Sequence, residues 1–122
     1  MTPLRIRTLR IFRLAIPMRV RFEHAAAKRD IADPVVVQLG PASPYAHLGG
    51  FGETLARPYV TGETAESVVD DIVQLFAPRL VGFAPDTFAD ALEFIEALPT
   101  QIGGRIVTAA RAALELALLD LV

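Results

Sequence analysis

Acidic side chains in two parts of the sequence could ligate a metal ion. Asp86, Asp90 and Glu93 recur at spacings that place them on one helical face. Asp70 and Asp71 are adjacent to each other further upstream. Carboxylate oxygens are the ligands that hard divalent cations prefer. The same spacing is also typical of a solvated helix face, and this is the interpretation that we favour.

Proton transfer has few candidate residues in this chain. Glu53 follows a strand-like Gly-Phe-Gly stretch and could be a general acid or base. No partner for it can be identified, so a structural hydrogen bond is the default interpretation. His24 and His47 are the only histidines, and both lie in loop-like stretches where surface or packing roles are typical. With no cysteine in the chain, neither a thiol nucleophile nor a zinc site is expected.

The glycine-rich stretch GGFGET does not match a nucleotide-binding loop. It lacks the Gly-x-Gly-x-x-Gly spacing, and it does not lead directly into a helix. We expect Gly49, Gly50 and Gly52 to permit the backbone geometry of a strand corner. Arg57 and Tyr59 follow in an exposed-type segment. Because arginine can bind a carboxylate with two hydrogen bonds and tyrosine offers a flat amphipathic surface, both are candidates for ligand contact.

Composition indicates one domain with a substantial core. The chain has 122 residues, of which 52% are hydrophobic, and its mean hydropathy is +0.41. No run of about 18 apolar residues is present, so no membrane-spanning helix is expected, and we predict a cytoplasmic protein. The net charge is −2, yet residues 1–29 hold eight of the twelve basic residues. Aromatic residues are rarely interleaved with them, so a nucleic-acid partner is not expected.

The first half of the chain has the pattern of strands. Apolar residues alternate over 4–16 with phase slips, which predicts a strand with a bulge that Pro17 ends. A β-branched run over 34–39 predicts a second strand, and 50–53 a short third one. The stretch RFEHAAAKRD has no clean period and is predicted to be a loop. Neighbouring strands joined by loops predict an antiparallel sheet.

The second half has the 3.6-residue period of helices. The first predicted helix begins after Thr64 as N-cap and ends near Pro78. A second begins after Asp86, ends before Pro99, and buries one face. That predicted buried face consists of Phe88, Ala91, Leu92, Ile95 and Leu98. A third is expected to begin near Gly104 or Arg105 and to run to the end. The fold class is therefore α+β: a three-stranded antiparallel sheet followed by a three-helix bundle.

The last predicted helix is apolar around most of its circumference. Thr108, Arg111 and Glu115 form one narrow polar stripe, and Asp120 lies on the opposite side. A surface helix normally has a single apolar stripe, so this helix should be covered on two sides. We expect Leu116, Leu119 and Val122 to be on a side that another segment or another chain covers.

These segments together resemble a known family. The stretches are IPMRVRFEHA, PVVVQL, the Gly-aromatic-Gly-Glu corner at 50–53, RPYVTGETAESV, and the alanine-rich AARAALELALLDL. Their order resembles the amino-terminal capping domain of the enolase superfamily, in its mandelate racemase and muconate lactonizing branch. The TGETAESV helix entry is most similar to the muconate cycloisomerase subgroup, which includes dipeptide epimerases and o-succinylbenzoate synthases. The resemblance covers essentially the whole chain, although the connection at 40–49 is longer than the family's usual hairpin.

The resemblance implies two loops that determine substrate specificity and exclude water. One corresponds to about 22–29, with Phe22 and His24 as candidate residues. The other corresponds to 54–60, with candidates Thr54, Arg57, Tyr59 and Val60. In such enzymes the 50–53 corner is structural.

The resemblance places the chemistry outside this chain. In such enzymes a carboxy-terminal β/α barrel of about 200 residues holds the catalytic lysines and a Mg²⁺ ion. Lys28 is the only lysine here, so no Lys-x-Lys pair exists and no catalytic or metal residue is assigned. Residues 1–122 would form the amino-terminal capping domain alone, inactive without the barrel. The expected partners are a small carboxylate substrate, the barrel, and further copies in a homo-oligomeric parent.

A different function class is also compatible with the sequence. The chain could be a stand-alone, non-catalytic binding or assembly module that docks through its apolar last helix. The downstream reading frame distinguishes the two hypotheses, because a barrel with paired lysines supports the enzyme and a stop codon after Val122 supports the module.

Overall fold

A three-stranded antiparallel sheet forms one layer of the protein. The computed structural model describes residues 3–24 and 27–122, with the backbone alone described between 18 and 31. The strands are β1 (Ile6–Arg13), β4 (Val35–Pro41) and β5 (Gly50–Thr54), in the order β1-β4-β5. The predicted sheet and α+β class are therefore confirmed.

The central strand, β4, pairs with β1 on one side and β5 on the other, and its residues alternate in burial. Val35, Val37 and Leu39 are fully buried, and the residues between them are half-buried. The buried side faces the helices, and the other side faces outward. The pairing of β1 with β4 shifts between Ile6 and Thr8, which is an irregularity of the kind that the phase slips over 4–16 predict.

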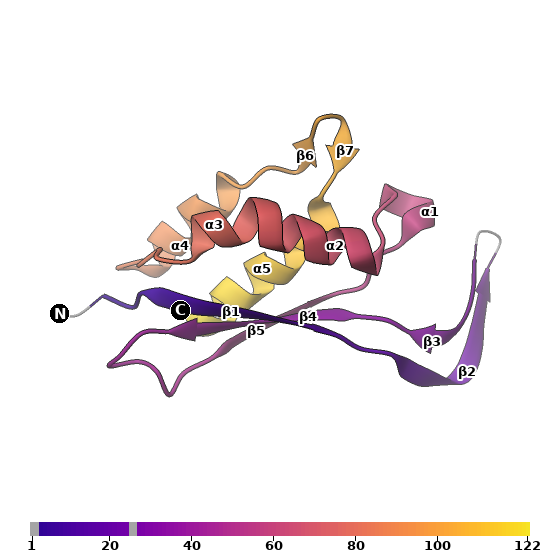
Figure 1. The fold of residues 1–122 in the computed structure, drawn as a ribbon, viewed down its shortest axis with the longest axis horizontal. Coiled ribbons are helices and arrows are strands. Elements are labelled where there is room, and N and C mark those ends of the chain that lie inside the picture. The colour runs from indigo at the N-terminus through magenta and orange to yellow at the C-terminus, as the bar shows by residue number, and fades with distance from the viewer. Residues whose placement is uncertain (1–2, 25–26) are drawn as a thin grey trace.

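The part of the chain that connects β1 to β4 forms a second, two-stranded sheet. It consists of β2 (Ile16–His24) and β3 (Ala27–Ala32), which pair as an antiparallel hairpin. The predictions that Pro17 ends the first strand and that RFEHAAAKRD is a loop are therefore wrong. This hairpin is not part of the three-stranded sheet and extends beyond its end (Figure 1). The sequence of this hairpin lacks the regular period that a core-facing strand has, which is why the pattern does not predict it.

The first long helix is continuous but includes a wider segment. It comprises α2 (Ala65–Asp71), the π-helical η1 (Ile72–Phe76) and α3 (Ala77–Leu80). The predicted end near Pro78 is wrong by two residues, since the helix passes this proline. A proline lacks an N–H and clashes with the carbonyl four residues earlier in a regular helix. The turn directly before the proline is wider than in an α-helix: the Ala77 N–H bonds to the carbonyl of Ile72, which is five residues back rather than four.

The second helix, α4 (Phe88–Glu96), begins one residue later than predicted. Thr87 is the N-cap, and Asp90 completes a capping box with it, so Asp86 is not the cap. Ala91, Ile95 and Leu98 are buried as predicted, whereas Phe88 and Leu92 are exposed. Phe88 is the first residue of the helix and lines an open hollow rather than the core.

The last helix, α5 (Thr108–Leu121), begins later than predicted because a hairpin precedes it. β6 (Gln101–Ile102) pairs with β7 (Arg105–Ile106). The two residues between these strands, Gly103 and Gly104, have φ angles of 57° and 79°. Positive φ at both central residues is characteristic of a tight two-residue hairpin turn.

The helices lie on one face of the three-stranded sheet, and α5 lies between this sheet and the other helices (Figure 1). It packs on β4 and β5 and also contacts α2, η1 and α4. The prediction of cover on two sides is thus confirmed, although the cover comes from this chain's own elements. Leu116 is nevertheless 51% exposed and Val122 is exposed, whereas Leu119 is partly buried against the core. Among the described residues, no helix is long and apolar enough to cross a membrane.

The exposed apolar residues of α5 generate a prediction about association. Leu116 lines an open hollow of about 410 Å³ together with Val36 and Phe51. We expect this surface to promote self-association of the isolated chain, because contiguous exposed apolar area is a typical contact site. Sedimentation of the wild-type chain should show a concentration-dependent oligomer, and Leu116→Gln should shift it toward monomer. A monomer at all concentrations would show that this surface does not drive association.

Candidate functional site

Two connecting segments leave the three-stranded sheet at the same end. Arg13 at the end of β1 pairs with Val35 at the start of β4, and Val35 pairs with Thr54 at the end of β5. The β2–β3 hairpin begins after the first of these residues, and the 55–62 segment begins after the last. The two segments in which sequence reasoning placed its candidate residues therefore leave the sheet at the same end.

The first segment positions its candidate residues on a strand rather than in a loop. Phe22 pairs with Arg29, and His24 pairs with Ala27, across the β2–β3 hairpin. The side chains of Phe22 and His24 lie outside the part of the structure that is described, so their role remains a prediction.

The second segment contains a helical turn, α1 (Pro58–Thr61), rather than a plain loop. Arg57 precedes it with extended backbone, and Gly62 ends it in the left-handed region with φ of 82°. Glycine adopts this left-handed backbone conformation without strain, because it has no Cβ atom. The 54–60 segment therefore contains part of a helical turn, where the sequence pattern predicts a loop.

The candidate residues Arg57 and Tyr59 lie together in this turn. Arg57 Nη1 donates a hydrogen bond to the Tyr59 hydroxyl over 3.2 Å. Both side chains are half-buried, and Val60 beside them is 65% exposed. Thr54, the last residue of β5, is half-buried. The geometry presents a guanidinium, a phenol ring and an apolar side chain on one short turn.

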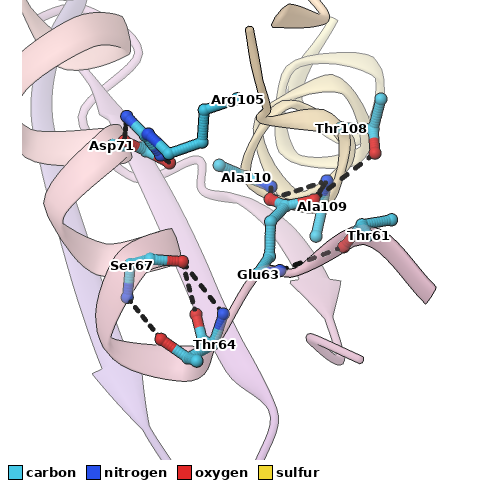
Figure 2. A network of polar contacts seen from close by, with 9 residues as sticks. All are labelled: Thr61, Glu63, Thr64, Ser67, Asp71, Arg105, Thr108, Ala109 and Ala110. Carbon is cyan, nitrogen blue, oxygen red and sulfur yellow. Dashed lines mark hydrogen bonds and ion pairs between the residues drawn. The ribbon is translucent and has the colours of Figure 1, made fainter. Parts of the chain in front are cut away.

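The carboxylate of Glu63 holds the downstream end of this segment (Figure 2). Glu63 is only 2% exposed. Its Oε1 accepts the Ala109 N–H at 2.9 Å, and its Oε2 accepts the Ala110 N–H at 3.2 Å. The Thr108 hydroxyl lies 3.4 Å from Oε1. Glu63 therefore satisfies N–H groups at the first turn of α5, where a negative charge is also favoured by the helix dipole.

The next residues fix the start of the long helix. The Thr64 side chain accepts the Ser67 N–H at 3.0 Å, and the Ser67 hydroxyl oxygen accepts the Thr64 N–H at 2.9 Å. This reciprocal pair confirms Thr64 as the predicted N-cap.

A second buried carboxylate joins the long helix to the β6–β7 hairpin. Asp71 is 4% exposed and accepts two hydrogen bonds from Arg105, each 2.8 Å long (Figure 2). The paired Asp71 carboxylate raises the pKa of Arg105 through this hydrogen bond and its negative charge. The bidentate geometry is the one that arginine forms best with a carboxylate.

The upstream end of the segment is held by close packing of β5 on α5. A Cβ atom at Gly52 would overlap the Ala113 carbonyl oxygen and lie 2.6 Å from the Ala117 nitrogen. A Cβ atom at Gly50 would overlap the Ala117 carbonyl oxygen. Neither glycine has a positive φ, so the expectation that they provide special backbone geometry is wrong. They are required because the helix backbone approaches the strand too closely for any side chain.

The remaining candidates from the sequence do not form a second site. Asp90 Oδ2 accepts the backbone N–H groups of Asp86 and Thr87, so this acid caps a helix. Glu93, Glu53 and His47 are exposed. Among the described residues, no three His, Asp or Glu side chains gather closely enough to hold a metal ion. An open hollow of about 460 Å³ at the opposite end of the sheet is lined mainly by apolar residues such as Leu4 and Phe88.

Sequence reasoning missed both buried carboxylates. Asp71 lies three residues after Val68 and directly before Ile72, on the face that the helical period identifies as buried. A charge on that face signals a partner elsewhere in the chain. Glu63 precedes an N-cap, and no local pattern reveals that it binds a helix 46 residues later.

The close packing of β5 on α5 generates a stability prediction. Gly52→Ala should lower the free energy of unfolding by about 1–3 kcal/mol or more, because the added methyl group has no space. Gly49→Ala is the matched control, since a Cβ there would meet no atom closer than 3.5 Å. Urea unfolding of both variants decides the point. Equal stability of the two would show that the strand and helix can separate at little cost.

Comparison with known proteins gives matches among solved structures. No protein-family model matches the sequence, and neither does any curated protein sequence. The L-Ala-D/L-Glu epimerase from Bacillus subtilis, solved with its substrate, is 26% identical with a TM-score of 0.78, over 94% of this chain and 30% of that chain.

Two further structures have the same relation to this chain. A protein from Sorangium cellulosum assigned to the mandelate racemase/muconate lactonizing enzymes is 33% identical with a TM-score of 0.71, over 98% of this chain and 31% of that one. A dipeptide epimerase from Enterococcus faecalis, complexed with Mg and the dipeptide L-Leu-L-Tyr, is 23% identical with a TM-score of 0.73, over 94% and 30%. Nearly the whole of this chain thus matches less than a third of each protein. In fold and sequence this chain is therefore similar to proteins of the mandelate racemase/muconate lactonizing enzyme family, and it spans about 30% of the length of each matched protein.

Proposed function

We propose that residues 1–122 are the capping domain of an enzyme that abstracts a proton alpha to a carboxylate. In this proposal the domain selects the substrate and excludes water, and the larger part of the enzyme performs the chemistry. The observation that carries the proposal is the emergence of two segments, the β2–β3 hairpin and 55–62, at one end of a rigid sheet. Binding residues are often on such connections, held by a rigid scaffold.

The substrate class follows from the side chains on α1 and its flank. Arg57 supplies a permanent positive charge that can bind a carboxylate with two parallel hydrogen bonds. Tyr59 supplies a flat apolar surface with a hydroxyl at its edge. The hydrogen bond between them orients the guanidinium on the turn. This arrangement supports a small substrate with a carboxylate and an apolar group, and the relatives solved with dipeptides fit that class.

The metal ion of the proposed reaction belongs to the part of the enzyme outside this chain. The relative from Enterococcus faecalis is complexed with Mg. Among the described residues, no three His, Asp or Glu side chains gather closely enough for such a site, and Glu63, Asp71 and Asp90 are each engaged with backbone N–H groups or an arginine. We therefore assign no step of the reaction to a metal ion held here.

We further propose that the full-length parent enzyme is homo-oligomeric and cytoplasmic.

Substrate selectivity provides a kinetic test of the proposal. In the full-length enzyme, Arg57→Ala and Tyr59→Ala should change the ratio of kcat/KM between substrates that differ in their side chains. Loss of an Arg57 hydrogen bond to a carboxylate should cost about 1.5–3 kcal/mol of transition-state binding. Arg79→Ala removes an equal charge from the exposed end of α3 and is the control. Unchanged substrate ratios in both loop variants would reduce the segment to a connector.

The location of the chemistry gives a separate prediction. The isolated chain should not catalyse exchange of the α-proton of dipeptide or muconate-type substrates in deuterated buffer with Mg²⁺. The reason is that the sequence has no pair of lysines, since Lys28 is the only one, and that no three His, Asp or Glu side chains gather into a metal site among the described residues. Nuclear magnetic resonance can follow the loss of the α-proton signal. Magnesium-dependent exchange above that of a mock-purified control would place the chemistry within this chain.

A further inference from the structure

The first turn of α5 depends on a residue that is distant in sequence. Its N-cap, Val107, makes no side-chain capping hydrogen bond. The carboxylate of Glu63 takes this role, with the Ala109 N–H 2.9 Å from Oε1 and 3.1 Å from Oε2. The Ala110 N–H binds the second oxygen as well. Both carboxylate oxygens are therefore in use, and the group is almost completely buried.

The backbone of Glu63 is equally constrained on the side of α1. Its N–H donates to the Thr61 hydroxyl oxygen over 3.3 Å. The Gly62 N–H donates to the Pro58 carbonyl oxygen over 3.0 Å, which closes the turn. Thr64 then caps α2. Glu63 thus lies between the end of α1 at Gly62 and the N-cap of α2 at Thr64, and its carboxylate binds the first turn of α5 (Figure 2).

The same helix holds the other end of the segment. Gly50 and Gly52 of β5 lie directly against the backbone of Ala113 and Ala117 in α5. The Phe51 N–H also donates to Asp120 Oδ2 over 2.9 Å. Both ends of the segment that carries Arg57 and Tyr59 are therefore attached to α5, one through packing and one through a carboxylate.

We propose that Glu63 is a positioning residue for substrate selectivity. Its carboxylate fixes α1 relative to α5, and this sets where Arg57 and Tyr59 present their polar groups. The inference rests on the proposed function for its link to selectivity, but its structural part can be tested alone. A carboxylate is required because an amide at this position has one acceptor oxygen, and its NH₂ group would face backbone N–H donors.

Hydrogen exchange of this chain tests the structural part with two matched variants. Glu63→Gln changes a buried carboxylate that binds α5, and Asp71→Asn makes the same change in a carboxylate that binds the β6–β7 hairpin. We expect amides in 55–62 and the first turn of α5 to exchange about tenfold faster or more in Glu63→Gln, as loss of one or two hydrogen bonds implies. Amides of β4 should stay protected, and Asp71→Asn should leave 55–62 unchanged.

A milder variant keeps the test valid if Glu63→Gln folds poorly. Thr61→Val removes the hydroxyl that accepts the Glu63 N–H and leaves the carboxylate on α5. We expect a smaller acceleration of exchange, confined to 58–63. Wild-type exchange of 55–62 in both Glu63→Gln and Thr61→Val would overturn the inference. So would equal acceleration of 55–62 in Asp71→Asn, because the effect would then be general loss of stability.

Substrate ratios in the full-length enzyme separate this inference from the proposed function. Glu63→Gln should change the ratio of kcat/KM between substrates in the same direction as Arg57→Ala, and Asp71→Asn should not. If the Arg57 and Tyr59 variants leave the ratios unchanged, the proposed function fails, whatever the exchange data show. If those variants change the ratios and Glu63→Gln does not, the positioning role of Glu63 is overturned and the proposed function stands.

Discussion

Contact between β5 and α5 without intervening side chains is the constraint on which the rest of the structure depends. At Gly50 and Gly52 the strand carries no Cβ atom, so the helix backbone at Ala113 and Ala117 can lie against it. Such close approach is a common reason for glycine within a strand. It brings the last helix of the chain onto the sheet, where α5 closes the core beneath α2 and α4. The position of α5 then determines what its first turn can bind.

Two buried carboxylates connect this core to its outer segments. Glu63 binds the first turn of α5, and Asp71 binds Arg105, whose side chain is 52% exposed. A buried acid is costly unless its oxygens are hydrogen-bonded, and both acids meet this condition. They therefore fix where α1 and the β6–β7 hairpin attach. The hydrogen bonds of Glu63 and Asp71 thus assign these two acids a structural role.

The sequence could predict the elements whose side chains face the core. The strand of 34–39 and the first face of the long helix follow from periods of two and 3.6, because burial imposes those periods. Thr64 was identifiable as an N-cap from its type and place. The β2–β3 hairpin was not identifiable, because RFEHAAAKRD has no alternation of apolar and polar residues. The Gly103-Gly104 turn was mistaken for a helix start, although paired glycines also indicate a hairpin.

The candidate site was predictable only in part. Arg57 and Tyr59 were recognisable as ligand-type residues, but their mutual hydrogen bond and the helical turn beneath them depend on the packing around 54–62. The role of Glu63 depends on a contact across 46 residues, which no local pattern encodes. The sequence shows glycine at 50 and 52, but the close approach of α5 that requires glycine there is visible only in the structure. Long-range contacts thus account for most of what sequence reasoning missed.

The central claim is that the 54–60 segment of this chain contacts the substrate of a larger enzyme. A crystal structure of the full-length protein with Mg²⁺ and a bound dipeptide or dicarboxylate analogue tests it most directly. We expect Arg57 or Tyr59 to lie within hydrogen-bonding distance of the ligand, about 2.7–3.2 Å between polar atoms. A ligand bound with neither residue in contact, and with 54–60 facing away from it, would contradict the account.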